Sequence, residues 1–215
     1  MGSHLTTRDV SCANFINRTN LHMTSSQIAR LFYKTASKNS SKTVANRRLA
    51  IMIEKRQLKR VRQYVSQEFI YYSKSLPAKL EHKQLMVEFL CKLRDSGVHF
   101  DLETVETEVC TWQKDYNIRP DMLMIIENSN GEKFHLIVEC DFSKKFTADK
   151  YSNFIDRRLT DPAILNIINN RLIIVSVCKT KPEPIKLSSG QVYKPVWVSS
   201  DFSNISNIAY LFIKK

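Results

Sequence analysis

The spacing of apolar positions changes along the chain, and these changes predict where its helices and strands lie. Thr24 and Gln27 have the spacing of a helix capping box, in which each side chain binds the other residue's backbone N–H. Ile28, Leu31 and Phe32 follow on one helical face. The pattern therefore predicts a short amphipathic helix that begins after Thr24.

A second helix is expected after the polar stretch 37–41. Ser41 can cap it, because a serine oxygen accepts a hydrogen bond from the first helical turn. Apolar residues then recur at helical intervals through Ile53. The exposed side of this helix is predicted to be polar and basic.

Beyond Gln57 the pattern becomes strand-like. Two apolar runs, 58–65 and 69–72, are separated by Ser66-Gln67, which predicts a hairpin. Helix, short connection, basic helix and basic hairpin is the order of a winged helix-turn-helix. We therefore predict a winged helix-turn-helix DNA-binding domain at residues 5–76.

A short break at residues 75–79 marks the predicted domain boundary. A buried helix is expected from Leu80 to Leu93, with Gly97 at its C-terminal end. Alternation of apolar and polar residues at 98–102 predicts a strand.

The remaining pattern predicts a sheet flanked by helices. Apolar runs at 122–126 and 134–138 enclose Asn130-Gly131, a strong hairpin signal. Further elements are expected as helices at 145–158 and 162–169 and as strands at 172–177 and 196–198. Residues 80–215 should therefore form a mixed α/β (α+β) domain, with a mixed sheet between helices.

The positive charge lies almost entirely in the first third of the chain. Residues 1–79 hold 15 Lys and Arg against 3 Asp and Glu, while the whole chain has a formal net charge of +12. The remaining residues are therefore neutral overall. A basic module joined to a neutral one favours nucleic acid as a partner over simple solubility.

The predicted second helix and hairpin hold the candidate DNA contacts. Asn46 and Arg47 suit the reading of base edges, while Lys59, Arg60 and Arg62 suit phosphate contacts. Lys42 and Arg48 complete the predicted DNA-binding set. The alternative is a charged, solvated helix pair that packs on the second domain.

Composition indicates the class of protein and its expected cellular location. With 43% hydrophobic and 25% charged residues, the chain is typical of a globular protein, and no apolar run is long enough for a membrane helix. The five cysteines are odd in number and contain no CxxC pair, which argues against disulfides and zinc. A reducing, cytoplasmic location without membrane partners is expected.

Carboxylates at the ends of two apolar runs are the candidate chemical groups. Asp121 precedes one run, and Glu139 and Asp141 end the next. Buried carboxylates are costly unless a cation compensates them, and hard divalent cations prefer oxygen ligands. The pattern therefore indicates a Mg²⁺ or Mn²⁺ site formed by Asp121, Glu139 and Asp141.

These motifs resemble the PD-(D/E)xK nuclease superfamily. A helix precedes a strand meander with Pro120-Asp121, the hairpin returns with Glu139-Cys140-Asp141, and another helix follows. Asp141 stands where the superfamily usually has lysine. Arg119-Pro120-Asp121, Glu139-Cys140-Asp141 and Lys150-Tyr151 are more similar to the replication-relaxation family and the plasmid mobilisation relaxases, in which an N-terminal winged helix precedes such a domain.

The resemblance implies a catalytic set of Asp121, Glu139, Asp141, Lys150 and an upstream acid. Glu88 is the predicted acid, with Glu81 as its alternative, and Lys144 and Lys145 are alternatives to Lys150. Lys150 would stabilise the charge of the phosphoryl group in the transition state or orient the nucleophile.

The predicted function is a metal-dependent DNA endonuclease that nicks DNA at a plasmid origin for mobilisation or replication. Its expected partners are origin or transfer-origin DNA, a second copy of the chain, and conjugation or replication proteins. The alternative is a non-catalytic DNA-binding replication factor or regulator with a vestigial nuclease fold. A tyrosine-nucleophile relaxase using Tyr71, Tyr72 or Tyr151 is disfavoured, because the five histidines show no paired spacing.

Overall fold

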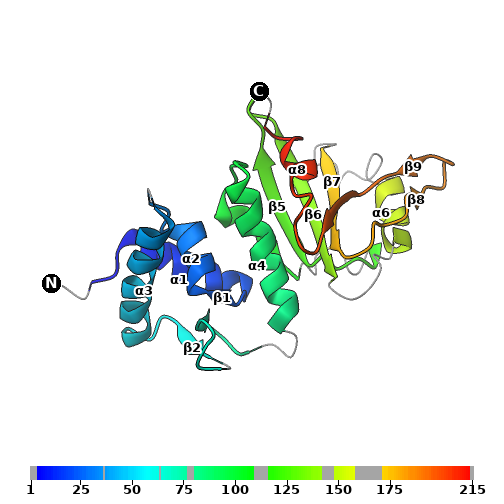
Figure 1. The fold of residues 1–215 in the computed structure, drawn as a ribbon. Helices are drawn as coiled ribbons and strands as arrows, with labels where there is room; N and C mark the ends of the chain where they lie inside the picture. Colours follow the sequence, from blue (N-terminus) through cyan, green and yellow to red (C-terminus); the bar gives the residue numbers. More distant parts are fainter. Residues whose placement is uncertain are drawn as a thin grey trace. The chain divides into compact units, whose positions relative to one another are not determined.

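The computed structural model describes residues 4–35, 37–62, 64–76, 80–108, 116–141, 148–157 and 171–213. The chain divides into two compact units, Met1–Cys91 and Lys92–Lys215. Helix α4, Leu80–Asp95, contains the point of division (Figure 1). The predicted domains, 5–76 and 80–215, differ from these units by assigning all of α4 to the second domain.

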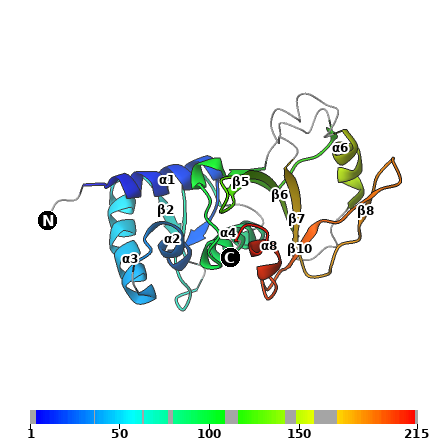
Figure 2. The same cartoon turned by 90° about the horizontal axis from the view of Figure 1, so that it is seen from above.

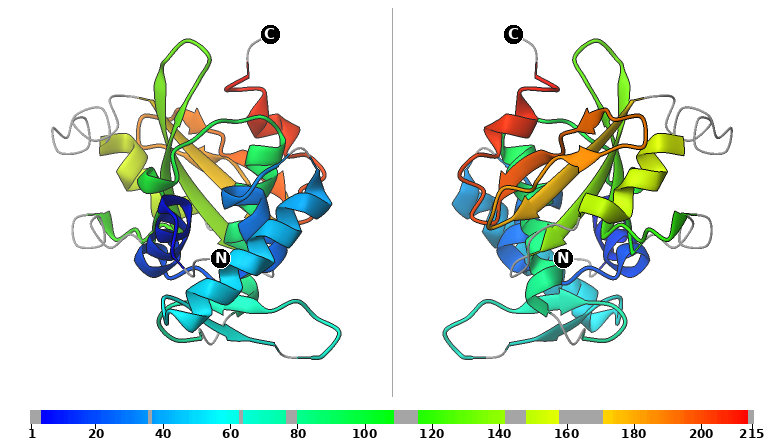
Figure 3. Two further views of the ribbon diagram at one scale, coloured as in Figure 1. Left: turned by 90° about the vertical axis from the view of Figure 1, so that its left-hand side faces the viewer. Right: turned by 90° about the vertical axis from the view of Figure 1, so that its right-hand side faces the viewer.

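Three helices and a small antiparallel sheet form most of the first unit. The sheet has the strand order β1-β3-β2, and the hairpin of β2 and β3 lies at the bottom of both views in Figure 3. The elements in chain order are α1 (Thr7–Thr19), β1 (Met23–Thr24), α2 (Ser25–Phe32), α3 (Lys38–Glu54), β2 (Lys59–Val61) and β3 (Ile70–Tyr72).

Local capping explains where these helices begin. The predicted box at Thr24 and Gln27 is confirmed at the start of α2. Helix α3 begins earlier than predicted, because the side chain of Ser37 accepts a hydrogen bond from the N–H of Ser40. Ser41 is instead buried within the helix and bonds back to the carbonyl of Ser37. The assignment of Ser41 as the cap was therefore wrong.

Helix α1 was not predicted. Thr6 and Asp9 form a capping box at its start, and its buried face includes Cys12, Phe15 and Ile16. Because its residues are polar on average, its apolar stripe is weak in the sequence. Tertiary contacts with the other helices fix it in place.

Asp9 is a fully buried carboxylate that joins α1 to the other helices. It accepts hydrogen bonds from the Thr6 backbone at 2.6 Å, from the Tyr33 hydroxyl at 2.6 Å and from the Arg48 guanidinium of α3. Burial opposes ionisation of Asp9, but the bonds from Arg48, Tyr33 and Thr6 outweigh it and hold its pKa well below the ordinary value. Asp9 is therefore ionised in the folded protein.

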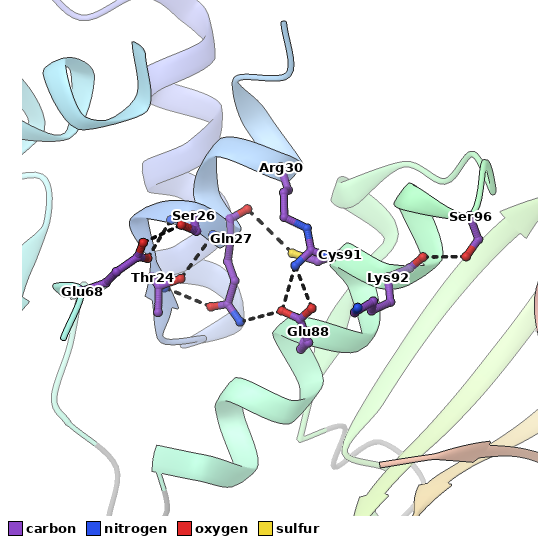
Figure 4. A network of polar contacts seen from close by, with 9 residues as sticks. All are labelled: Thr24, Ser26, Gln27, Arg30, Glu68, Glu88, Cys91, Lys92 and Ser96. Carbon is purple, nitrogen blue, oxygen red and sulfur yellow. Dashed lines mark hydrogen bonds and ion pairs between the residues drawn. The ribbon is translucent and has the colours of Figure 1, made fainter. Parts of the chain in front are cut away.

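Glu68 connects the hairpin to α2 and α3. It accepts a hydrogen bond from the Ser26 hydroxyl at 2.6 Å and one from the Ser26 backbone at 3.1 Å (Figure 4). It also forms an ion pair with Lys42. Burial raises the pKa of Glu68, but the bonds from Lys42 and Ser26 have the larger combined effect and lower it to about 2. The Ser26 bonds fix the hairpin beside the start of α2, and the ion pair with Lys42 fixes it to α3.

The second unit is built on a mixed five-stranded sheet with the order β10-β7-β6-β5-β4. Strands β10, β7, β6 and β5 are labelled in Figure 2. Strands β10, β7 and β6 are parallel, whereas β5 is antiparallel to β6 and β4. The elements are η1 (Leu102–Thr104), β4 (Glu106–Thr107), β5 (Met122–Glu127), β6 (Lys133–Asp141), η2 (Ala148–Tyr151), α6 (Ser152–Arg157), β7 (Leu172–Cys178), β8 (Ile185–Lys186), β9 (Val192–Tyr193), β10 (Val196–Ser199) and α8 (Ser206–Ala209). The prediction of a mixed α/β architecture is confirmed.

The central hairpin and the two later strands follow the prediction. Gly131 has a φ of 77°, which the turn between β5 and β6 requires and which side chains other than glycine rarely adopt. The predicted strand at 98–102 was wrong: only Phe100 forms a bridge, with Ile126, and Leu102 begins a 3₁₀ turn. Of the predicted helix at 145–158, the described part is η2 and α6, and the helix at 162–169 lies outside the described residues.

The two faces of this sheet are both buried. One face packs Ile137 and Ile174 against Tyr151, Phe154 and Ile155 of η2 and α6. The other face buries the alternate residues, which are Met122, Met124, Ile126, Leu136, Val138 and Cys140. This alternation places residue 139 of β6 on the face that η2 covers.

Within the described part of the chain, no helix combines the length and the apolar character needed to cross a membrane.

Replacing Asp9 with alanine should lower the free energy of unfolding by about 3–5 kcal/mol, because it leaves the Arg48 charge without its buried partner. Urea denaturation measures this change. The matched control is Glu54→Ala at the exposed end of α3, which should change stability by less than about 0.5 kcal/mol. Equal losses in the two variants would contradict a structural role for Asp9.

Candidate functional site

Asp121 and Glu139 lie opposite each other across the β5–β6 hairpin. Met122 pairs with Val138, so the next position of the same register places Asp121 against Glu139. The backbone N–H of Cys140 donates a 2.8 Å hydrogen bond to Asp121 Oδ2. The antiparallel register therefore brings together two acids that are 18 positions apart in the sequence.

Lys150 and Tyr151 of η2 approach the same carboxylate. Lys150 Nζ lies 2.9 Å from Glu139 Oε1, and the Tyr151 hydroxyl donates to that oxygen as well. Phe154 and Ile155 of α6 are buried against the sheet, which fixes the preceding turn above Glu139. The Lys150 side chain keeps 33% of its surface exposed, whereas Tyr151 is fully buried.

The electrostatic environment of Glu139 opposes its ionisation. Burial is the main cause that raises its pKa, and the negative charge of Asp121 adds to the effect. Lys150 and the Tyr151 hydroxyl act in the opposite direction without cancelling it. Carboxyl groups whose pKa is raised by burial and a neighbouring acid are enriched at functional sites.

Tyr151 is a neutral hydrogen-bond donor here. Burial and the nearby charge of Glu139 raise its pKa far above the ordinary value. The hydroxyl therefore keeps its proton and holds Glu139 Oε1 in one orientation.

Asp141 lies two residues further along β6, on the same face as Glu139, and pairs in register with Cys178. The described residues contain no group of three or more His, Cys, Asp or Glu side chains placed to hold a metal. The structure thus brings together Asp121 and Glu139 but does not form the predicted three-carboxylate ligand set.

Two opposed carboxylates nevertheless suit Mg²⁺. This ion commonly binds one or two protein carboxylates and keeps several waters. Burial and the charge of Asp121 both raise the pKa of Glu139, and a divalent charge beside the two acids would offset both effects. The donor set therefore fits Mg²⁺ or Mn²⁺.

Glu88 is engaged elsewhere. It belongs to the first unit and accepts bonds from Arg30 Nη1 at 2.7 and 2.9 Å and from Gln27 Nε2 at 3.2 Å (Figure 4). These contacts join α4 to α2, so the carboxylate predicted to be catalytic has a structural partner. Its alternative, Glu81, is exposed, while Lys144 and Lys145 lie outside the described residues.

Sequence reasoning missed one neighbour of the site. Ser176 of β7 pairs in register with Glu139, is buried, and lies with its hydroxyl 3.1 Å from Cys178 Sγ. A serine inside an otherwise apolar strand was the available signal. Arg119 of the predicted motif is exposed and pairs with Glu108 at 3.4 Å.

The predicted DNA-binding residues divide into two groups. The exposed members on α3 are Lys42, Asn46 and Arg47. The exposed members on the hairpin are Lys59, Arg60 and Arg62. Lys42 also pairs with Glu68, as described above. Arg48 differs from the others, because its guanidinium is bound to Asp9 and its side chain is only 17% exposed.

Two arginines of the hairpin contact the same aromatic ring. The guanidinium carbons of Arg60 and Arg62 lie 4.4 and 4.6 Å from the centre of the Phe69 ring. Such cation–π contacts hold both side chains on one face of the hairpin.

Comparison with known proteins identifies no matching family model, no matching curated protein and no matching solved structure.

Replacing Glu139 with glutamine should raise the free energy of unfolding at pH 8. The folded protein disfavours the ionised carboxyl, so its stability falls as pH rises from the ordinary pKa of 4.5 through the raised value. The gain should therefore be largest at pH 8 and should shrink below pH 4.5, where wild-type Glu139 is protonated in both states.

Urea denaturation at both pH values measures this gain. Glu132→Gln is the control on the same hairpin, since Glu132 is 40% exposed and pairs with Arg171. A loss of stability at pH 8 in Glu139→Gln would show that the Lys150 pair outweighs desolvation.

Proposed function

We propose that this chain is a metal-dependent DNA endonuclease, in which the first unit binds double-stranded DNA and the second unit cleaves one strand. The observation that supports this most directly is the convergence of Asp121, Glu139 and Lys150 on one end of the central hairpin. An acid pair can hold a divalent ion for phosphodiester cleavage, and a neighbouring lysine can stabilise the charge that develops on the phosphoryl group.

The order of elements in the first unit favours a winged helix-turn-helix. Helices α1, α2 and α3, with β1 between the first two, are followed by a hairpin that completes a three-stranded sheet. In that module the helix before the hairpin enters the major groove. Here that helix is α3, whose exposed side presents Asn46 and Arg47.

The order of elements in the second unit favours a PD-(D/E)xK-like domain. Helix α4 leads into the antiparallel meander β4, β5 and β6, and η2 and α6 lead to the parallel strand β7. Asp121 and Glu139 then occupy the two acidic motif positions. Asp141 stands at the usual lysine position, and Lys150 supplies the positive charge from η2 instead.

Asp121 and Glu139 would hold the Mg²⁺ or Mn²⁺ ion. When bound, the ion would polarise a phosphoryl oxygen and lower the pKa of a water ligand. Tyr151 keeps Glu139 oriented through its hydroxyl. Lys150 is partly exposed beside the acid pair, so its ammonium group can contact a phosphate and stabilise the charge that develops on it.

The resemblance to the replication-relaxation family suggests the biological substrate. We propose a plasmid origin or transfer origin, nicked for replication or mobilisation. A non-catalytic DNA-binding protein is the competing interpretation, and the pairing of Lys150 with Glu139 is compatible with it.

With Mg²⁺ or Mn²⁺, the protein should convert supercoiled plasmid containing its own origin to open circles, as gel electrophoresis would show. Asp121→Asn and Glu139→Gln should each reduce the rate by about 100-fold or more, because each removes a ligand charge at the cleavage site. Glu132→Gln is the matched control and should retain the wild-type rate.

Tight, salt-sensitive DNA binding without nicking in either metal would exclude the nuclease. It would leave the DNA-binding regulator as the function. Equal nicking by wild type and both acid variants would instead indicate a contaminating activity.

The two groups of DNA contacts should separate in binding assays. Asn46→Ala should weaken binding to the preferred site by about 1–3 kcal/mol, because it removes a contact to a base edge. Arg60→Ala should weaken binding to all sequences and lower the salt slope by about 1. Fluorescence anisotropy across salt concentrations measures both, and unchanged affinity in both variants would exclude the winged-helix interpretation.

A further inference from the structure

A basic hollow lies in the first unit where the start of α1 meets the side of α3. Its volume is about 630 Å³, and the lining includes Thr7, Arg8, Tyr33, Val44, Arg47 and Arg48. A volume of this size falls in the range of sites that bind small molecules or chemical groups. All the residues that line the hollow belong to the first unit.

The lining holds three arginines and no acid. Arg48 is neutralised by the buried Asp9 behind it. Arg8 and Arg47 are both exposed, and no ion pair joins either of them to a described acid. Their guanidinium groups therefore give the hollow a positive potential that an anion would relieve.

The start of α1 adds little to this potential. Thr6 accepts a bond from the N–H of Asp9, and Asp9 accepts one from the N–H of Thr6. These contacts already satisfy part of the first turn. The site therefore depends on the arginines, whose planar groups bind phosphate oxygens in pairs.

Arg47 connects the hollow to the proposed recognition helix. Asn46, the neighbouring residue, lies on the exposed side of α3. We propose that the hollow binds a backbone phosphate of the DNA that α3 contacts, with Arg8 as its main ligand. This assignment rests on the proposed DNA-binding function.

A phosphate held by Arg8 would fix how α3 enters the groove. Such a contact is independent of base identity, so it would add affinity and orientation without adding sequence preference. Arg8 lies over the Tyr33 ring at 6.0 Å, which keeps its side chain near the hollow. The contact would be additional to those of the β2–β3 hairpin.

The test measures DNA affinity by anisotropy at several salt concentrations for the full chain and its Arg8→Ala variant. Arg8→Ala should lower the slope of log K against log salt by about 0.9, equally for specific and random duplexes. Arg8→Lys should retain the slope, because it keeps the charge. Arg18→Ala is the matched control at the other end of α1 and should also retain it.

Unchanged slope in Arg8→Ala, while the wild type binds DNA, would overturn this assignment alone. Absence of DNA binding by the wild type would overturn both this assignment and the proposed function. A thermal-shift experiment with inorganic phosphate at constant ionic strength tests the other source of the anion. If Arg8→Ala removes the stabilisation by phosphate but leaves DNA binding unchanged, the hollow binds a free anion, and the backbone contact is overturned.

Discussion

The free-energy cost of removing a carboxylate from water is the constraint on which both units depend. In the first unit, Asp9 is fully buried, and the donors around it lower its pKa despite that burial. In the second unit, Glu139 is also largely buried, but the bonds from Lys150 and Tyr151 do not compensate fully, and its pKa is raised. A satisfied buried acid fixes the packing of helices, whereas an incompletely compensated one retains affinity for an added positive charge.

The two sites also differ in how the chain assembles them. Asp9 joins separate helices through contacts that are distant in sequence, so its role is to order the first unit. Asp121 and Glu139 meet through the register of one hairpin, and that register follows from the Asn-Gly turn and the apolar alternation of its strands. A shift of one residue would move Glu139 to the other face, away from Lys150. The placement of Asp121 against Glu139 therefore follows from the register of the hairpin alone.

Features set by local chemistry were predictable from the sequence. The capping box at Thr24, the β5–β6 hairpin and the strand β7 are encoded within short segments, and all three are observed. The partners of Arg48 and Glu88 were not predictable, because Asp9 and Arg30 approach them only after the helices pack.

The dependence on contacts that form only in the folded chain also explains the elements that were missed or misplaced. Helix α1 has a weak apolar stripe, and the segment after Gly97 alternates like a strand but pairs at Phe100 alone. For the site, the hairpin placed Asp121 against Glu139 as the sequence indicated. The contact of Lys150 with Glu139 depends on how η2 returns over the sheet, which no local pattern specifies.

The stacking of Arg60 and Arg62 on Phe69 has a consequence for the entropy of association. A free arginine side chain loses up to about 2 kcal/mol of rotamer freedom when it is immobilised. In the hairpin, the shared ring already restricts both guanidinium groups before any partner arrives. An anion that meets them therefore encounters side chains that are ordered in advance, and less of the interaction energy is lost to ordering.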